Sequence, residues 1–368
     1  MSTKRSREAS KKLTYAETGV DRQLRAKSKT ALRVLSKTYR FSRYGQVVKL
    51  PYGNVFPISG DTYLDLTIEG VGTKVLLAQL ANKYDTIGID GIAMAVNDVI
   101  RSGAKPLAMA DNIHAHVSDP ALVKEWMKGI VKGADEAECI VPGGEIGDVP
   151  ELIKGLVDGK GFDMVFASVG EVSRENLVSA DDLEPGDTVI GLRSSGIHSN
   201  GISLARKVLF KQWGGKYDPF DIPDGLNREL VHEALEPTRI YVRAVGNLVN
   251  KRLVKAAVHV TGDAYLKFGR LSQFNHGVGF EFDNFKPQPV FTVIQEASEA
   301  LGARISDAEM FKTFNMGWGF AVVVSNSRKD EVVDSLERSG VQAEQIGRVT
   351  ASRKIVIRNR NKKILLKG

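Results

Sequence analysis

The chain has 368 residues but only one cysteine and no long apolar run, and each absence excludes a class of protein. Cys139 cannot form an internal disulfide, and its apolar neighbours favour a buried, inert thiol in a reducing compartment over a catalytic one. A membrane-spanning helix needs about 18 consecutive apolar residues, so no membrane span is expected. The basic N-terminus is not followed by the apolar stretch of a secretory signal. We therefore expect a cytoplasmic protein.

Acidic residues are scarce at both ends of the chain, and this accounts for its net charge of +7. Residues 1–12 carry a net charge of +4 and residues 351–368 one of +7, so the remaining body is acidic. A nucleic-acid-binding domain instead gathers basic and aromatic side chains on one folded face. We interpret the basic ends as solvated tails and expect no specific nucleic-acid partner, although weak attraction to polyanions stays open.

Strand-like and helix-like segments alternate in both halves of the chain, and a length of 368 residues predicts two domains. The polar stretch 172–187, with its Pro185-Gly186 turn, is the expected boundary. In the N-terminal half we expect strands near 62–68, 107–112, 139–141 and 162–170, with helices near 89–101 and 120–136. In the C-terminal half we expect strands near 188–192, 256–260, 277–282, 319–324 and 343–349, with helices near 202–210, 238–250, 290–300 and 329–339. The predicted fold class is α+β, with two mixed αβ domains.

A glycine-containing loop, Glu69-Gly70-Val71-Gly72-Thr73-Lys74, lies between a predicted strand and a predicted helix. Glycines there let backbone N–H groups approach a ligand, and a helix N-terminus favours an anion. The lysine adds a positive charge, and the glutamate could hold Mg²⁺ on the same phosphates. The spacing does not match a Walker A loop. A tight turn with a surface lysine explains the loop equally well on its own.

Further motifs occur in a specific order along the chain. They are Gly143-Gly144-Glu145, Ser194-Ser195-Gly196-Ile197-His198-Ser199-Asn200-Gly201, Pro237-Thr238-Arg239-Ile240-Tyr241, His259-Val260-Thr261-Gly262 and Thr313-Phe314-Asn315. In this combination the sequence resembles the aminoimidazole ribonucleotide synthetases, also called phosphoribosylformylglycinamidine cyclo-ligases. The resemblance extends over residues 15–357, nearly the whole chain.

The resemblance implies a fold, a reaction and an assembly. It implies a basic tail over residues 1–13, an N-terminal αβ domain over 14–173 that binds ATP and Mg²⁺, and a C-terminal αβ domain over 174–368. N-terminal strands of two subunits would form a barrel at a homodimer interface. The implied enzyme is an ATP-dependent ligase of purine biosynthesis. It phosphorylates the formamide oxygen of formylglycinamidine ribonucleotide, closes the imidazole ring, and releases ADP and phosphate.

The same resemblance implies roles for individual residues. The implied catalytic residues are His198 and Lys74. The implied nucleotide-binding residues are Glu69, Gly70, Gly72, Thr73 and Lys74. The implied substrate-binding residues are Ser194, Ser195, Ser199, Asn200, Thr238, Arg239, Thr261 and Asn315. The implied magnesium ligands are Glu69, Asp98, Asp111 and Glu145.

Several of these roles have a plainer alternative. Asp98 lies three residues before Arg101 on a predicted helix, so an ion pair explains it as well. Ser199 or Asn200 could cap the helix expected near 202. His198 lies among small polar residues rather than on an apolar face, and its ordinary pKa near neutrality suits acid–base chemistry.

Departures from the family pattern leave other functions open. Glu69 stands where many members have aspartate, Asp263 follows Thr261-Gly262 in place of a glycine, and 146–151 and 41–45 also differ from the usual segments. The alternatives are another ATP enzyme of the same fold family, such as a formylglycinamidine ribonucleotide synthetase or a small-molecule kinase, and a non-catalytic nucleotide-binding regulator.

Overall fold

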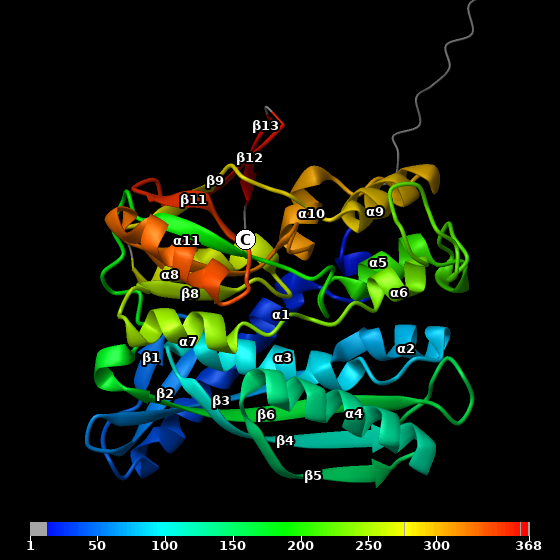
Figure 1. The fold of residues 1–368 in the computed structure, drawn as a ribbon, viewed down its shortest axis with the longest axis horizontal. Coiled ribbons are helices and arrows are strands. Elements are labelled where there is room, and N and C mark those ends of the chain that lie inside the picture. Colours follow the sequence, from blue (N-terminus) through cyan, green and yellow to red (C-terminus); the bar gives the residue numbers. More distant parts are fainter. Residues whose placement is uncertain (1–12, 276, 361, 367–368) are drawn as a thin grey trace, which may run out of the picture.

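The computed structural model describes residues 13–275, 277–360 and 362–366, and it divides them into two halves that pack against each other. Each half contains one mixed β-sheet (Figure 1). The N-terminal sheet ends at Ser173 and the C-terminal sheet begins at Thr188. The basic tail expected over residues 1–13 falls almost entirely outside the described part of the chain. The mixed two-domain αβ architecture expected from the sequence is confirmed.

The N-terminal sheet has six strands in the order β1-β2-β3-β6-β4-β5. Their bounds are β1 Val48–Leu50, β2 Gly53–Ser59, β3 Thr62–Gly70, β4 Lys105–Ala115, β5 Ile140–Asp148 and β6 Phe162–Ser173. The helices of this half are α1 Arg22–Lys29, α2 Val75–Ala81, α3 Ile87–Val99 and α4 Pro120–Ala137, with 3₁₀ segments at η1 Ala16–Thr18, η2 Thr30–Phe41, η3 Gly72–Lys74 and η4 Ile100–Ser102. The sequence did not indicate β1, β2, α1 or η2.

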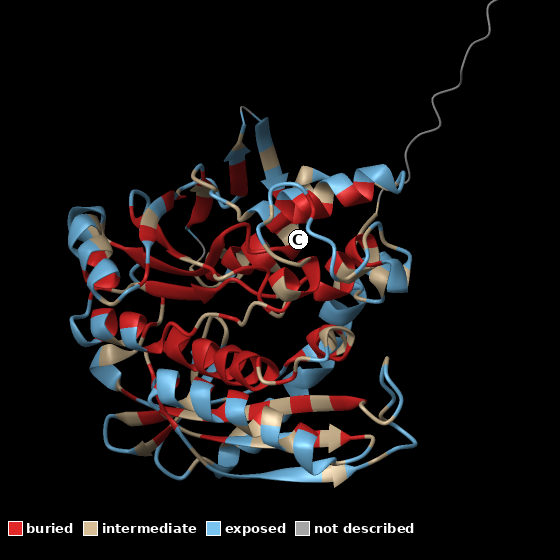
Figure 2. Cartoon of the chain, turned by 45° about the vertical axis from the view of Figure 1, so that its right-hand side comes forward, coloured by how far each residue is buried: buried red, intermediate tan, exposed pale blue. Residues whose placement is uncertain are grey.

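Helices α3 and α4 lie on one face of this sheet. α3 is buried along its whole length, because it lies between the sheet, α4 and the C-terminal half. α3 and α4 approach closely at Gly88 and Gly129: a Cβ on Gly129 would lie 2.2 Å from the carbonyl oxygen of Asp85. In the part of the chain that the structure describes, α3 and α4 leave the opposite face uncovered, and this face is largely exposed in Figure 2. Alternation along β3 places Leu66 and Ile68 on this open face, with 61% and 69% of their surfaces exposed.

The C-terminal sheet has seven strands in the order β13-β12-β9-β11-β7-β10-β8. Their bounds are β7 Thr188–Arg193, β8 Ala256–His259, β9 Gly279–Phe282, β10 Trp318–Val324, β11 Ala343–Thr350, β12 Ile355–Asn359 and β13 Lys362–Leu366. The helices are α5 Ile202–Leu209, α6 Leu230–Ala234, α7 Val242–Asn250, α8 Phe268–Phe274, α9 Pro289–Ala300, α10 Asp307–Thr313 and α11 Lys329–Arg338, with a 3₁₀ turn η7 at Ala264–Lys267. Strands β7 and β10 are entirely or almost entirely buried at the centre.

Most predicted elements are present, with two informative corrections. The helix expected over 238–250 begins only at Val242, because residues 238–241 run in extended or irregular form along α3. The basic C-terminal end is not simply a solvated tail, since 355–359 and 362–366 pair as β12 and β13 at the edge of the sheet. Cys139 is buried, and burial raises the pKa of its thiol to about 11, as an inert residue requires. Among the described residues, no helix is long and apolar enough to cross a membrane.

Candidate active site

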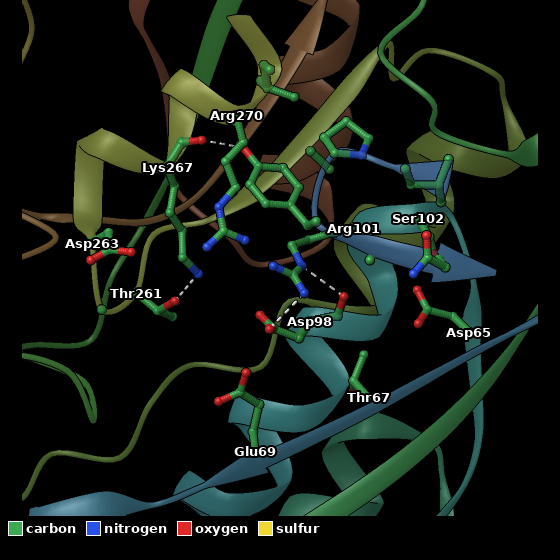
Figure 3. Close-up of a pocket in the computed structure, with 18 of the residues that line it drawn as sticks. Asp65, Thr67, Glu69, Asp98, Arg101, Ser102, Thr261, Asp263, Lys267 and Arg270 are labelled. Carbon is green, nitrogen blue, oxygen red and sulfur yellow. Dashed lines mark hydrogen bonds and ion pairs between the residues drawn. The ribbon is translucent and has the colours of Figure 1, made fainter. Parts of the chain in front are cut away.

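A cleft of about 370 Å³ lies where the two halves meet. One wall is formed by β3 and the end of α3, and the opposite wall by η7 and α8 of the C-terminal half (Figure 3). Helix α1 also contributes Arg25 and Lys29 to the lining of the cleft, although it precedes both sheets in the chain. Segments separated by more than 200 residues therefore create one site.

Carboxylates from β3 and α3 gather in this cleft. Alternation along β3 puts Asp65 and Glu69 on the side that faces the helices, and both line the cleft with Asp98. Burial, and then the neighbouring charge of Asp98, raises the pKa of Glu69 to about 7. Burial raises the pKa of Asp65 to about 6, against the effects of the Ser102 hydroxyl and Arg101. The adjacent carboxylates of Glu69 and Asp98, in a partly desolvated site, are suited to a bound cation.

Asp98 is surrounded by positive and hydrogen-bonding groups. Its carboxylate contacts Arg101 Nη2 at 2.7 Å and His259 Nδ1 at 2.8 Å, so the ion pair with Arg101 that the sequence suggested is present. Desolvation acts against the ionised form, but Arg101, Lys267 and His259 outweigh it and hold the pKa of Asp98 well below its usual range. Asp98 is thus kept ionised although only 6% of it is exposed.

Cations that the sequence did not single out also line the cleft. They are Arg25, Lys29, Lys267 and Arg270, and they lie in the cleft together with Arg101. Lys267 is 8% exposed, and its Nζ donates to the carbonyl oxygen of His259 at 3.1 Å and to the hydroxyl of Thr261. Burial lowers the pKa of Lys267 to about 8. The only signal in the sequence was that Lys267 and Arg270 closely follow the Thr261-Gly262 motif.

The four expected metal ligands do not converge. Glu69 and Asp111 both pair with Phe166 of β6, from opposite sides, so a whole strand separates them. Asp111 alternates with buried residues on the helix-covered face, whereas Glu145 pairs with Asn112 and lies on the other face. Within the described ranges, no group of three or more His, Cys, Asp or Glu side chains could hold a metal ion. Of these four expected ligands, Glu69 and Asp98 line the cleft, whereas Asp111 and Glu145 are not among its lining residues.

The segment 69–74, expected to be a loop between a strand and a helix, is partly strand. Gly70 still belongs to β3, and Gly72 has a φ of +69°, which favours glycine. Thr73 Oγ1 lies 2.9 Å from Ser203 Oγ in the other half. Lys74 is 0% exposed and does not line the cleft, so the alternative interpretation as a surface lysine is wrong.

Lys74 belongs to a buried polar network that joins the two halves. Its Nζ contacts both carboxylate oxygens of Asp90, at 2.9 and 2.8 Å, and donates to the carbonyl oxygen of Glu236 at 2.6 Å. Asp90 also accepts from Thr238 N and Oγ1, at 2.8 and 2.6 Å, and from Ser199 Oγ at 3.1 Å. We call Lys74, Asp90, Ser199 and Thr238 the interdomain latch.

A second contact between the halves extends the latch along α3. Asn97 Nδ2 donates to the carbonyl oxygen of Arg239 at 2.8 Å, and Asn97 Oδ1 accepts from Tyr241 N at 3.0 Å. The motif at 237–241 thereby docks onto α3. The side chain of Arg239 lines a separate cavity of about 270 Å³ beside α7, not the cleft.

His198 lies in the protein interior. It is 1% exposed and does not line the cleft. The backbone N–H of Ser195 donates to its Nε2 at 3.2 Å. Burial, followed by the nearby His259, lowers the pKa of His198 well below its ordinary value, so the imidazole is neutral near pH 7. The N-cap of α5 is Gly201 with no side-chain cap, so the alternative capping roles of Ser199 and Asn200 are wrong.

The remaining candidate residues divide between the cleft and the interior. Asn200 and Thr261 line the cleft. Ser194 Oγ instead bonds to Asn315 Oδ1 at 3.1 Å, and Asn315 Nδ2 donates to the carbonyl oxygen of Gly196 at 2.9 Å. Ser195 Oγ donates to the carbonyl oxygen of Pro237. These buried bonds hold the loop 194–201 in place behind the cleft.

Two αβ halves around a cleft lined by carboxylates and cations define a two-domain αβ protein whose cleft could contact both a cation and an anion. Residues 52–172 match the model of the AIR synthase related protein N-terminal domain, and residues 184–359 match that of its C-terminal domain. The chain belongs to this family, as the order of its motifs predicted.

Named relatives make the family membership more specific. The chain is 38% identical over 344 residues to phosphoribosylformylglycinamidine cyclo-ligase of Methanothermobacter thermautotrophicus. This alignment covers 92% of this chain and 94% of that protein. It is 36% identical to the Pyrococcus furiosus protein of the same name, over 94% of this chain and 98% of the relative. The solved structure of the hydrogenase maturation protein HypE shares the fold, with a TM-score of 0.59 at 17% identity over 85% of this chain and 90% of that one.

Proposed function

We propose that this protein converts formylglycinamidine ribonucleotide and ATP into 5-aminoimidazole ribonucleotide, ADP and phosphate, as a cytoplasmic step of purine biosynthesis. The observation that carries the proposal is the cleft between the halves, which combines Glu69 and Asp98 with a set of cations. The two relatives named phosphoribosylformylglycinamidine cyclo-ligase, each aligned over more than 90% of this chain, support the substrate and the product.

The proposed chemistry has two balanced steps. The formamide oxygen attacks the γ-phosphorus of ATP, an O–P bond forms, and the bond to the β-phosphate oxygen breaks to release ADP. The amidine nitrogen then attacks the activated formyl carbon and a C–N bond closes the ring. The C–O bond breaks, so phosphate leaves with the formyl oxygen, and the ring releases protons to solvent as it becomes the imidazole. Phosphoryl transfer of this kind is catalysed mainly by positioning and charge neutralisation.

Glu69 and Asp98 would hold Mg²⁺ in this reaction. The fit is supported by the raised pKa of Glu69 beside the ionised Asp98, because a divalent cation between them would relieve their repulsion. Mg²⁺ uses few protein carboxylates and keeps phosphate and water ligands, so two carboxylates are sufficient. The ion would supply neutralisation of the triphosphate charge. Asp111 and Glu145 are not part of this proposed set.

The roles of the other candidate residues follow from their positions. We assign Asn200 and Thr261, which line the cleft, to contacts with the ribonucleotide. We assign Ser194, Ser195 and Asn315 to positioning of the loop behind the cleft. Its buried neutral imidazole suits His198 to positioning rather than to proton transfer near neutral pH.

We also propose a homodimer formed through the open face of the N-terminal sheet, with the strands of two subunits closing a barrel. The exposed Leu66 and Ile68 on an uncovered sheet support it, since a face of this kind is typical of an interface. Both residues also border the cleft. A partner on this face would therefore help to close the site.

The function is tested by measuring ADP release from purified protein with ATP, Mg²⁺ and one candidate substrate at a time. We expect ADP and the imidazole product only with formylglycinamidine ribonucleotide. ADP release with formylglycinamide ribonucleotide and an ammonia source would support the synthetase alternative, and nucleotide binding without turnover would support a regulator. Asp98→Asn should weaken binding of the Mg²⁺–nucleotide complex, with circular dichroism as the check on folding.

A further inference from the structure

Two lysines follow the glycine-containing motifs of this chain, and only one of them reaches the cleft. Lys74 is fully buried, and its Nζ contacts Asp90 and the carbonyl oxygen of Glu236. Lys267 lines the cleft, and Figure 3 shows its ammonium group directed toward the space that it shares with Thr261, Asp98 and Glu69. The cation that a phosphoryl transfer requires is therefore available from the C-terminal half.

The contacts of Lys267 leave it ready for an anion. Its two acceptors, the carbonyl oxygen of His259 and the hydroxyl of Thr261, are uncharged. Across residues 13–275, 277–360 and 362–366, no carboxylate lies within ion-pair distance of its Nζ. An ammonium group has three N–H donors, so these two bonds leave one for a ligand. An anion in the cleft would complete its coordination.

Other cations add to the positive charge that lines the cleft. Arg270 follows Lys267 by three residues, and Arg25 and Lys29 lie on α1. Burial, followed by the charges of Arg270 and Arg25, lowers the pKa of Lys29. None of the three has a carboxylate within ion-pair distance in the described part of the chain. Their mutual repulsion would be relieved by a ligand with several negative charges, such as a triphosphate.

Lys267 and the carboxylates occupy the places that a metal–phosphate ligand needs. Glu69 and Asp98 lie on the N-terminal side of the shared space, and Lys267 lies on the C-terminal side (Figure 3). A phosphoryl group between them would meet a metal ion on one side and an ammonium group on the other, which spreads its charge during transfer.

We propose that Lys267, and not Lys74, is the catalytic lysine that contacts the γ-phosphate of ATP and stabilises the phosphoryl group during transfer. The assignment of ATP rests on the proposed function. The ammonium group keeps its proton throughout and acts by charge. A ribonucleotide 5-phosphate has the same chemistry, so the experiment must separate the two phosphate sources.

The test compares Lys267→Met with Lys251→Met, an exposed lysine at the end of α7. Calorimetry gives the affinities for Mg²⁺–ADP and for a non-hydrolysable Mg²⁺–ATP analogue. We expect Lys267→Met to lose about 10-fold or more in affinity for the analogue and about 100-fold in kcat, as when one charge-stabilising donor is removed. The affinity for ADP should change little, and Lys251→Met should behave as the wild type.

Three results would overturn the proposal. The first is unchanged analogue affinity and unchanged kcat. The second is an equal loss for analogue and ADP. The third is unchanged nucleotide affinities with a raised KM for the ribonucleotide, which would assign Lys267 to the 5-phosphate. If the wild type makes no product, the proposed function fails, whereas the comparison of analogue with ADP still decides the role of Lys267.

A second variant covers the possibility that Lys267→Met does not fold. Lys267→Cys can be alkylated with 2-bromoethylamine to restore an ammonium group of similar length, and the only native cysteine, Cys139, is buried. We expect Lys267→Cys to be weak in binding the analogue and the alkylated form to recover. Recovery of thermal stability without recovery of analogue binding would show a purely structural lysine.

Discussion

Asp65 is a buried carboxylate whose ionisation works against folding. Burial is the largest cause of its raised pKa of about 6, compared with 3.8 for an unperturbed aspartate. Between these pH values the folded protein binds more protons than the unfolded chain, so the free energy of unfolding falls as the pH rises. Above pH 6 this loss of unfolding free energy is nearly complete, and it amounts to up to about 3 kcal/mol.

We therefore expect Asp65→Asn to raise the free energy of unfolding at pH 7 and to change it little at pH 4. Denaturant unfolding at a series of pH values measures this difference directly. Asp158→Asn, at an exposed loop position, serves as the control and should stay within about 0.5 kcal/mol of the wild type at both pH values. Equal effects of Asp65→Asn at pH 4 and pH 7 would contradict the explanation by desolvation.

The interdomain latch depends on an ion pair that is removed from solvent. Lys74 and Asp90 are both 0% exposed. Removal of one partner leaves a buried charge without its counterion, which costs about 3–5 kcal/mol, whereas replacement of both by apolar residues costs less. We expect Lys74→Met and Asp90→Leu each to destabilise the fold strongly and the double variant to be more stable than either. Denaturant unfolding of all four proteins gives the coupling energy.

The exposed pair Lys83–Asp85 provides the comparison for the latch. The side chain of Lys83 is 42% exposed and that of Asp85 is 40% exposed. Because exposed ion pairs contribute about 0–1 kcal/mol, Lys83→Met should have a small effect. If Lys74→Met were as mild as Lys83→Met, the buried ion pair would not be what stabilises the interdomain latch.

The packing of α3 against α4 depends on glycine at two facing positions. A Cβ on Gly129 would lie 2.2 Å from the carbonyl oxygen of Asp85, and backbone atoms cannot move away as a flexible side chain can. We expect Gly129→Ala to destabilise the protein by about 1–3 kcal/mol through overpacking.

Gly246 in α7 provides the control for this prediction. A Cβ on Gly246 would have nothing within 4 Å, so Gly246→Ala should stabilise the protein by about 0.5–1 kcal/mol. Thermal unfolding of the two variants should shift in opposite directions.

The open face of the N-terminal sheet determines the expected assembly of the whole molecule. Leu107 and Ile140 lie on adjacent strands of this face and are 41% and 64% exposed. A stable dimer typically buries about 1,200–2,000 Å² of surface, and lysines in its apolar centre would be desolvated. We expect the Leu107→Lys, Ile140→Lys variant to be monomeric by sedimentation velocity when the wild type is dimeric. A wild type that is monomeric at micromolar concentration would contradict the proposed dimer.

The helical side of the same half supplies the control for this experiment. Val131 on α4 is 68% exposed but lies away from the open face. Val131→Lys should leave the dimer intact. Dissociation by Val131→Lys and not by the open-face variant would move the interface to α4.

Local patterns in the sequence determined much of this protein. Alternation and helical periodicity located the central strands and long helices of both halves, because these elements bury continuous apolar faces. The ordered motifs determined the family. The ion pair of Asp98 with Arg101 followed from a three-residue spacing on one helix. The short strands β1, β2 and β13 gave too weak a period to be recognised, and their pairing depends on neighbours elsewhere in the chain.

Only the tertiary structure decided which charged residues belong to the site. A lysine after a glycine loop can face a ligand or the interior, and Lys74 faces the interior because Asp90 and the segment 236–238 from the other half surround it. Lys267 reaches the cleft because η7 turns toward β3, about 200 residues earlier in the chain. Glu69 and Asp111 are separated because β6, later in sequence, is inserted between their strands. In each case the deciding contact is between segments far apart in the chain, and a local pattern carries no information about such a contact.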